Sequence, residues 1–134
     1  MQSLAHERSC VAPVNVGSAR RLLDELIQYV KEVQCEGRPL SQNPIVRQKL
    51  ADRAIEVETL KMFAYQTVWK MSQGVIPVYE PSRDKAFSDE VSGRIAITGT
   101  VTWPAYPMFF PYSKWAGIRG SLQHSYLLFP GLSI

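Results

Sequence analysis

The stretch Asn43–Gly74, NPIVRQKLADRAIEVETLKMFAYQTVWKMSQG, decides the fold of this chain. Asn43 is a favourable N-cap, because its side-chain oxygen can accept hydrogen bonds from the first free backbone N–H groups of a helix. Pro44 suits the first helical position, and Gly74 suits a left-handed C-terminal cap. No other Gly or Pro interrupts the run. The sequence therefore predicts one continuous helix over residues 44–73, about 45 Å long.

Apolar side chains recur near one face of this predicted helix, as expected for a helix packed against a core. These residues are Val46, Leu50, Ala54, Val57, Ala64, Val68 and Met71. A helix of this length depends on packing partners along its whole face, so the rest of the chain must supply them.

The composition is that of an ordinary globular domain over residues 1–134, with 46% hydrophobic and 20% charged residues. The net charge of +3 is small and dispersed, with no basic cluster that interleaves with aromatic residues, so nucleic acid is not an expected partner. No apolar run approaches the roughly 18 residues of a membrane span. The N-terminal segment MQSLAHERSC carries charges where a signal peptide needs an apolar centre, so a cytoplasmic location is expected.

The two cysteines, Cys10 and Cys35, lie far apart, with no second Cys or His at metal-ligand spacing. We expect both to be reduced thiols, buried or half-buried.

Residues 3–33 predict a first helix that packs against the long one. Its apolar positions recur at helical spacing, namely Leu22, Leu23, Leu26, Ile27 and Val30. Pro13 predicts a kink or a slower start. Gly37 and Pro39 mark the turn into the long helix, and this short connection makes the two helices antiparallel neighbours.

A third helix is predicted over residues 83–97, after a loop that contains two prolines. Ser82 is its expected N-cap, Asp84 favours the positive end of its dipole, and Gly99 is expected to close it.

Residues 101–112, VTWPAYPMFFPY, combine three prolines with five aromatic residues and resist any regular assignment, because the prolines exclude a helix interior and a central strand. Two interpretations stay open: a loop folded onto the helices, or a surface for a partner. Residues 113–128 predict a fourth helix. The expected fold is all-α, an antiparallel up-down four-helix bundle. The apolar ending FPGLSI indicates a chain that is cut short.

Catalytic motifs are sparse when the residues are considered by themselves. His6 and His124 are isolated in sequence, and there is no glycine-rich phosphate loop, HExxH motif or nucleophile elbow. Glu56 and Glu58 fall on different faces of the long helix and are expected to be solvated charges.

The run VRQKLADRAIEVETLKMFAYQTVWKMSQG resembles the central helix of the C-terminal helical domain of acyl-CoA dehydrogenases. Three further segments resemble successive parts of that domain: ARRLLDELIQYVKE, PSRDKAFSDEVSGRIA and SKWAGIRGSLQHSYLLFPGLSI. The resemblance covers most of residues 3–134. It implies a flavin enzyme, with FAD as cofactor, that desaturates the α,β bond of an acyl-CoA. The N-terminal helical domain and the middle β-domain of that family have no counterpart in this sequence.

The resemblance also implies a catalytic pair. In some branches of the family the first helix opens with a Glu directly before an Arg, and that Glu removes the α-proton of the acyl thioester. Glu7 and Arg8 in the segment LAHER match this pair. Such a base must be a carboxylate in a desolvated site, which brings its pKa toward the working range. The alternative is that Glu7 is an exposed carboxylate at a helix start, favoured by the dipole.

The sequence departs from the family where the first helix ends. The family often has an Arg there, followed closely by Phe-Gly, which hold the flavin nucleotide of an adjacent subunit; here Val33 replaces the Arg and Glu36 replaces the Phe. A carboxylate beside a pyrophosphate is repulsive. Because the other domains of the family have no counterpart here and Val33 and Glu36 replace groups on the nucleotide, the chain is expected to be inactive in isolation. Apolar faces that those domains would cover are left open, so a homo- or hetero-oligomer is expected. The alternative function is a non-catalytic helical partner module that has lost flavin binding.

Overall fold

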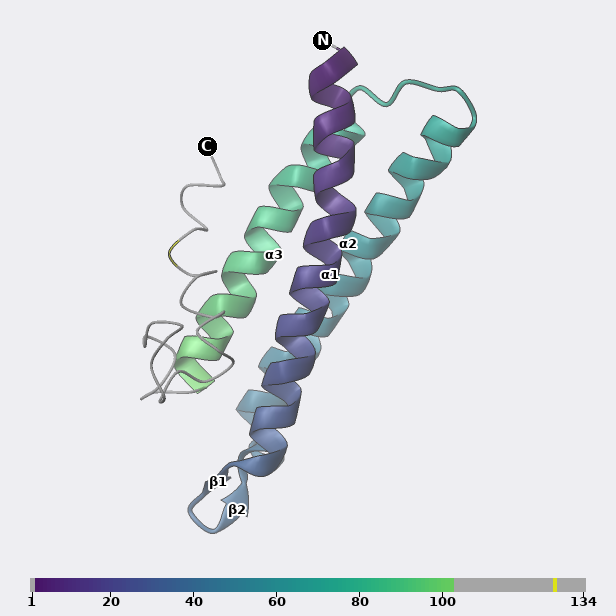
Figure 1. The fold of residues 1–134 in the computed structure, drawn as a ribbon. Helices are drawn as coiled ribbons and strands as arrows, with labels where there is room; N and C mark the ends of the chain where they lie inside the picture. Colours follow the sequence, from purple (N-terminus) through teal and green to yellow (C-terminus); the bar gives the residue numbers. More distant parts are fainter. Residues whose placement is uncertain (1, 103–126, 128–134) are drawn as a thin grey trace.

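The computed structural model describes residues 2–102 and residue 127, and of residues 2–12 it describes the backbone alone. Three long helices run side by side in alternating directions, with a small hairpin at one end of the bundle (Figure 1). The elements are α1 (Gln2–Glu32), β1 (Gln34–Cys35), β2 (Arg38–Pro39), the short 3-10 helix η1 (Leu40–Gln42), α2 (Pro44–Ser72) and α3 (Glu80–Thr102).

Helix α2 confirms the long helix that the sequence predicts. The Asn43 side chain accepts hydrogen bonds from the backbone N–H of Ile45 at 2.9 Å and of Val46 at 3.4 Å. Pro44 occupies the first helical position. At the other end Gly74 has a φ of +75°, in the left-handed region that favours glycine after a helix. The two signals at the ends therefore fix the bounds of α2 within one residue.

Helix α1 agrees with the predicted first helix and begins one residue earlier. It passes through Pro13 without a break, so the slower start expected there is not found. The first helix therefore extends over almost the whole length of the bundle, antiparallel to α2 (Figure 1).

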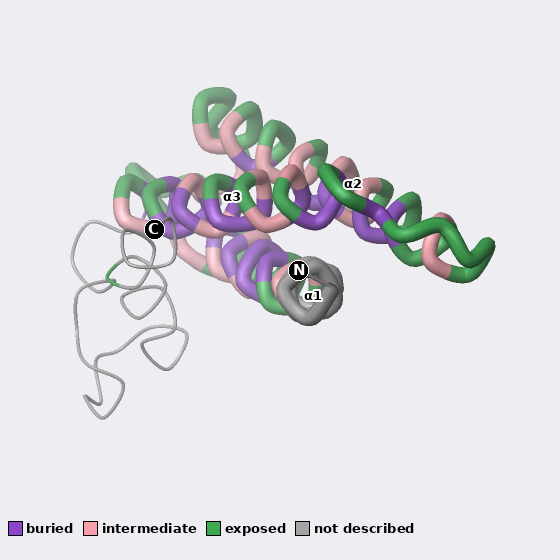
Figure 2. The backbone as a smooth tube through the Cα atoms, turned by 90° about the horizontal axis from the view of Figure 1, so that it is seen from above, coloured by how far each residue is buried: buried purple, intermediate pink, exposed green. Residues whose placement is uncertain are grey.

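The core lies between the three helices, and Figure 2 shows the buried positions along the sides where the helices face one another. Its residues are Ala19, Leu22, Leu23, Leu26 and Val30 from α1, Leu50 and Val57 from α2, and Val91 and Ile95 from α3. These residues recur at helical spacing, with intervals of one, three or four residues in α1, seven in α2 and four in α3, so the apolar face predicted from the sequence is the face that packs in the core.

The predicted apolar face of α2 is wrong at one residue, Val68. Val68 is 49% exposed, whereas its neighbour Thr67 is only 1% exposed. The buried positions Val57, Leu60, Ala64 and Thr67 follow a spacing of three or four. Val68 lies about 100° farther around the helix. It therefore points away from the core.

Helix α3 is longer than predicted at both ends. It begins at Glu80, so Ser82 lies inside the helix rather than at its N-cap. It continues through Gly99 to Thr102. A glycine inside a helix costs only about 1 kcal/mol relative to alanine, and the packing of α3 against α1 and α2 outweighs that cost.

The turn that the sequence predicts at Gly37 is a complete two-stranded hairpin. Gln34 pairs with Pro39 and Cys35 pairs with Arg38 in antiparallel register. Glu36 and Gly37 have φ values of +53° and +78°. A two-residue turn with positive φ at both central positions matches the right-handed twist of the strands.

The described residues form a three-helix bundle, so the predicted all-α class holds, whereas the fourth helix is not confirmed. Apart from Val101 and Thr102 in α3, the segment 101–112 lies outside the described residues, and so does the predicted helix 113–128 except for Leu127. Among the helices that the structure describes, none contains an apolar stretch of the length that a membrane span needs.

Candidate functional site

The predicted catalytic pair lies in the first turns of α1. The backbone of Glu7 and Arg8 is helical, and their side chains lie outside the part of the chain that the structure describes. Glu7 precedes Glu32, the last residue of α1, by 25 positions (32 minus 7), which corresponds to a rise of about 38 Å. The pair and the hairpin therefore lie at opposite ends of the bundle (Figure 1).

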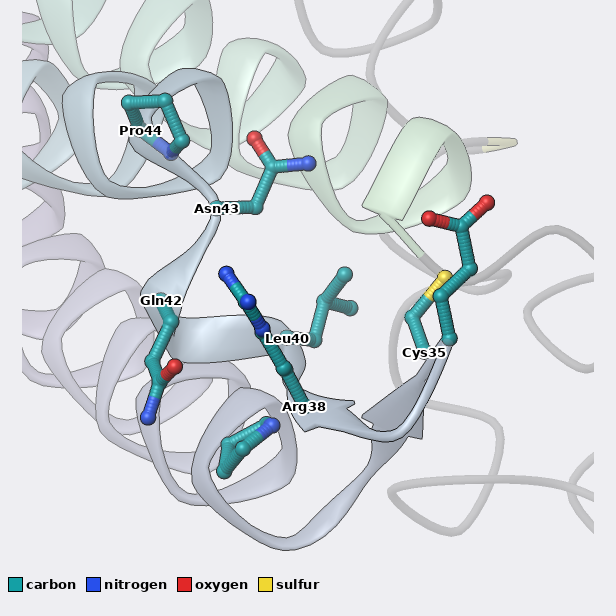
Figure 3. Close-up of a pocket in the computed structure, with 8 residues that line it drawn as sticks. Cys35, Arg38, Leu40, Gln42, Asn43 and Pro44 are labelled. Atoms are coloured by element: carbon teal, nitrogen blue, oxygen red, sulfur yellow. The ribbon is translucent and has the colours of Figure 1, made fainter.

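A surface pocket of about 450 Å³ lies at the hairpin end. The residues that line it come from the hairpin, from η1 and from the start of α2: Cys35, Glu36, Arg38, Pro39, Leu40, Gln42, Asn43 and Pro44. Figure 3 shows the Arg38 side chain rising from β2 toward Asn43, between Gln42 and Leu40. Glu36 and Arg38 bring one negative and one positive charge to the pocket wall.

A cluster of polar side chains, Thr67, Arg83 and Asp84, links α2 to α3 at the end opposite the hairpin. Arg83 donates from Nε at 2.9 Å and from Nη2 at 2.7 Å to Oδ1 of Asp84, and Thr67 donates to Oδ2 of Asp84. The guanidinium of Arg83 also lies 4.0 Å from the ring centre of Phe63 and 5.5 Å from that of Tyr79. Burial acts to lower the pKa of Arg83, but its interactions with Asp84 and Tyr79 outweigh burial and raise that pKa.

This Arg83–Asp84 group is a structural joint rather than a reactive site. Asp84 is fully buried, and both of its carboxylate oxygens accept hydrogen bonds. Its charge is compensated by the adjacent guanidinium, as buried charges require. The carboxylate that the sequence predicted in the first turn of the third helix therefore holds two helices together.

Residues 1–100 match the family of the acyl-CoA dehydrogenase C-terminal domain. The chain belongs to this family. The match covers α1, the hairpin, α2 and nearly all of α3, so the resemblance seen in the sequence of the long helix extends over three helices.

One curated relative is the L-prolyl-[peptidyl-carrier protein] dehydrogenase of Serratia sp. (strain ATCC 39006), 29% identical over 72 residues, which are 54% of this chain and 19% of the relative. A solved glutaryl-coenzyme A dehydrogenase in complex with glutaryl-CoA matches with a TM-score of 0.82 at 23% identity, over 96% of this chain and 31% of that one. PigA with FAD and proline matches with a TM-score of 0.82 at 20% identity, over 98% of this chain and 32% of that one. The chain thus spans about a fifth to a third of the length of these proteins.

The hairpin does not fit the nucleotide contact that the acyl-CoA dehydrogenase pattern places there. Val33, at the position of the family's Arg, is half-buried and carries no donor on its side chain. Glu36, at the position of the family's Phe, is exposed and lines the pocket. Asn43 already uses its side-chain oxygen to cap α2. Arg38 is the single cation among the lining residues, and a carboxylate opposes it, so this pocket is poorly suited to a pyrophosphate.

The other residues singled out in the sequence fall into three groups. Glu58 is an exposed carboxylate, as expected, and pairs with Arg20 at 2.6 Å. Glu56 is not a solvated charge: its side chain is 18% exposed and bonded to Arg94 of α3 at 2.9 Å. The two do lie on different faces, since one reaches α1 and the other α3. His6 and His124 lie outside the side chains that the structure describes.

Cys35 is a free thiol, as expected, but it is exposed rather than buried. Its position on a two-stranded hairpin at the tip of the bundle leaves it without a covering element, and Cys10 is outside the described side chains. Among the described residues, no three His, Cys, Asp or Glu side chains converge as a metal site would require.

Proposed function

We propose that this chain is the C-terminal helical domain of an FAD-dependent dehydrogenase that acts on an acyl thioester. The observation that carries the proposal is the family match over residues 1–100, which includes the Glu7–Arg8 pair at the start of α1. One relative is named for a carrier-protein substrate and one structure for a CoA thioester complex. An acyl group on a thioester is the substrate class common to both names, so we leave the carrier open.

The part of the reaction assigned to this chain is removal of a proton. Glu7 takes the α-proton of the acyl thioester, and Arg8 is its electrostatic neighbour. When bound, the flavin supplies the acceptor for the hydride that leaves the β-carbon. A carboxylate can act as this base only when the α-carbon lies within hydrogen-bond reach and water is kept away, because desolvation raises its pKa toward the working range.

Isolated from further domains, the chain is expected to be inactive. The positioning of substrate and cofactor contributes of order 7–11 kcal/mol to lowering the barrier of such a reaction. The chain spans 19% of the curated relative and 31% of the glutaryl-CoA complex, and we assign most of that positioning to the parts of such proteins outside this domain.

The distance along α1 favours assembly with other subunits. The Glu7 end and the hairpin end are about 38 Å apart along one helix, so the same flavin cannot easily contact both ends within one copy. In the resembling family an Arg and its neighbours at this end often hold the flavin nucleotide of an adjacent subunit, a contact for which Val33 and Glu36 of this chain are poorly suited. An oligomer is therefore part of the proposal, either of this chain alone or with a related chain.

A second candidate function is a helical partner module that has lost flavin binding. The observation that favours it is the pocket at the hairpin, where Val33 and Glu36 replace the groups of the family pattern and leave Arg38 opposed by a carboxylate. Such a module would assemble with catalytic subunits and contribute surface rather than chemistry.

The deciding experiment adds cofactor, substrates and the other two domains of a family member to the chain as separate components. The chain is mixed with FAD, a panel of acyl-CoA and acyl-carrier-protein thioesters and an artificial electron acceptor, with and without the N-terminal and middle domains of a family member. We expect no reduction of the acceptor by the chain alone, reduction by the mixture, and its loss with Glu7→Gln. The matched control is Glu32→Gln, an exposed carboxylate at the other end of α1, which retains activity. A mixture that is active with Glu7→Gln supports the partner module instead.

A further inference from the structure

A buried carboxylate, that of Glu80, lies at the end of the bundle where α1 begins. Glu80 is 6% exposed, and Lys70 of α2 donates a hydrogen bond to its Oε1. Lys70 is also the one cation among the described residues that pairs with this carboxylate, and no described side chain donates to its other oxygen, Oε2. A buried carboxylate is most stable when both oxygens accept hydrogen bonds, so Oε2 of Glu80 can still take a donor.

The register of α1 against α3 places Arg8 level with Glu80. The two helices run parallel (Figure 1), and Asn15 of α1 donates from Nδ2 to Oγ of Ser88 on α3 at 2.9 Å. Seven residues before that contact, on either helix, are Arg8 and Pro81 (15 minus 7 and 88 minus 7). Since both helices rise by about 1.5 Å per residue, Arg8 lies level with Pro81 and with its neighbour Glu80.

The register of α1 against α2 leads to the same level. These helices are antiparallel, and Arg20 donates to Glu58 at 2.6 Å. Twelve residues before Arg20 on α1 is Arg8, and twelve residues after Glu58 on α2 is Lys70 (20 minus 12 and 58 plus 12). Lys70 is the residue that bonds to Glu80. Two separate contacts between helices therefore place one charged residue of each helix in a single layer of the bundle.

The helical repeat also places Arg8 on the core face of α1. Leu26, which is 0% exposed, follows Arg8 by 18 positions (26 minus 8), and 18 residues are about five whole turns of a helix. Glu7 lies about 100° around the helix from Arg8, so the two members of the candidate pair occupy different faces. An arginine on a core face requires a counter-ion, because an unpaired buried charge is costly. Glu80 is a buried carboxylate at the right level.

We propose that Glu80 is a positioning residue for the catalytic pair: its carboxylate binds Arg8 through Oε2 while Lys70 binds Oε1. A guanidinium and a carboxylate form a charge-assisted contact that is stronger than a hydrogen bond between neutral groups. This contact ties the first turns of α1 to the start of α3, and so fixes the turn of helix that presents Glu7. The inference rests on the proposed function, because a fixed Glu7 affects catalysis only where Glu7 is the base.

The first test is a double-mutant cycle on the full chain, without flavin or substrate. Urea unfolding compares the wild-type chain with Arg8→Gln, Glu80→Gln and the double variant. We expect the two substitutions to be coupled by at least about fivefold in the unfolding equilibrium constant. A Glu80 that only stabilised α3 would lower stability without this coupling. The matched cycle pairs Arg8→Gln with Glu90→Gln, which removes a 56% exposed carboxylate of α3 about 15 Å farther along the helix, and it should be additive.

The second test measures kcat and KM in the mixture of the chain with the other domains of a family member. Glu80→Gln is expected to lower kcat about tenfold and to leave KM within about twofold, because the base is misplaced while substrate binding is kept. Adding Glu80→Gln to Arg8→Gln should lower kcat no further, since the two residues act as a unit. Glu80→Asp keeps the charge and should recover most of kcat. Glu90→Gln should leave both constants unchanged.

An additive cycle between Arg8 and Glu80 would overturn the proposal, and so would a kcat that Glu80→Gln leaves unchanged in an active mixture. In the second case a loss of kcat with Glu7→Gln would still identify Glu7 as the base, so the proposed function can stand while the positioning role fails. A mixture that is inactive with the wild-type chain would contradict the proposed function instead. The cycle alone would then decide whether Glu80 binds Arg8.

Discussion

Thr67 of α2 donates a 2.5 Å hydrogen bond from Oγ1 to Oδ2 of Asp84 on α3, and neither residue is more than 1% exposed. Seventeen positions separate them in sequence, across the whole loop between the two helices. With Arg83 on the other carboxylate oxygen, this contact fixes the start of α3 against the last turns of α2. The joint is polar at a position where an amphipathic pattern alone would have predicted an apolar residue.

Asp84→Ala is expected to lower the free energy of unfolding by about 3 kcal/mol. The change leaves Nε and Nη2 of Arg83 and the hydroxyl of Thr67 without their acceptor in a largely buried site, while Nη1 of Arg83 keeps its bond to Gln66. This loss costs more than a surface ion pair contributes. Urea unfolding followed by circular dichroism measures the effect. The control is Glu90→Ala, which removes a 56% exposed carboxylate from its pair with Arg94 and should change stability by less than about 0.5 kcal/mol. Equal losses of unfolding free energy in the two variants would mean that the contacts of Asp84 do not hold α2 and α3 together.

Acid is expected to weaken the bundle through Glu80. The hydrogen bond from Lys70 lowers the pKa of Glu80 below its ordinary value of 4.5, with help from the Glu80 backbone and against the effect of burial. A pKa that is lower in the folded than in the unfolded state stabilises the fold above the unfolded value. That contribution is lost as the pH falls below about 4.5 and through the folded value.

The measurement compares the wild-type chain with Glu80→Gln from neutral pH to about pH 3. The stability difference between the two proteins should be largest near neutral pH and should shrink in acid. A difference that stays constant over this range would show that the charge of Glu80 contributes nothing to stability.

The sequence contains strong local signals for both ends of α2 and only one weak signal for the start of α3. Asn43, Pro44 and Gly74 act through the backbone next to them, so local chemistry is enough to place the ends of α2. The start of α3 depends on Glu80, which bonds to Lys70 on another helix. Pro81, in a first helical turn where proline is favoured, was the local clue to this earlier start.

Some residues of the candidate site could likewise be predicted from the sequence, and others depend on the fold. Glu7 and Arg8 come from a short motif and the resemblance it carries, whereas the pocket at the hairpin depends on the backbone of Glu36 and Gly37. A Glu-Gly pair is not among the dipeptides that signal such a turn, so the sequence predicted a turn there and not strands. The sequence assigned Asp84 only to the first turn of a helix, because its partner Thr67 could not be known before α2 and α3 were packed.

Leu50→Asp is expected to destabilise the chain by more than about 4 kcal/mol, since it places an unpaired carboxylate in the core. Leu50 is 8% exposed and belongs to the core cluster of all three helices. The matched control is Ile45→Asp on the same helix, where the side chain is 65% exposed and a negative charge in the first turn is favoured by the dipole. Thermal unfolding should show a large loss for Leu50→Asp and little change for Ile45→Asp. Similar melting temperatures for the two variants would place Leu50 outside the core.

In the hairpin turn, one substitution is expected to raise the free energy of unfolding rather than lower it. Glu36 has a φ of +53°, a conformation that costs most side chains about 1–2 kcal/mol and costs Asn less, because its short polar side chain bonds locally. Asn-Gly is also the preferred pair for a turn of this geometry. Glu36→Asn is therefore expected to raise the free energy of unfolding by up to about 1 kcal/mol. Urea unfolding of the full chain measures this gain.

The neighbouring glycine provides the control that separates backbone strain from charge. Gly37 has a φ of +78°, and a Cβ placed there meets no atom within 4 Å, so any cost of Gly37→Ala comes from the backbone alone. That variant should lose about 1–2 kcal/mol. Glu36→Gln removes the charge but keeps the strain, and should leave stability nearly unchanged. If Glu36→Gln stabilises the chain as much as Glu36→Asn does, the gain comes from the lost carboxylate, and the positive φ of Glu36 is not a source of strain.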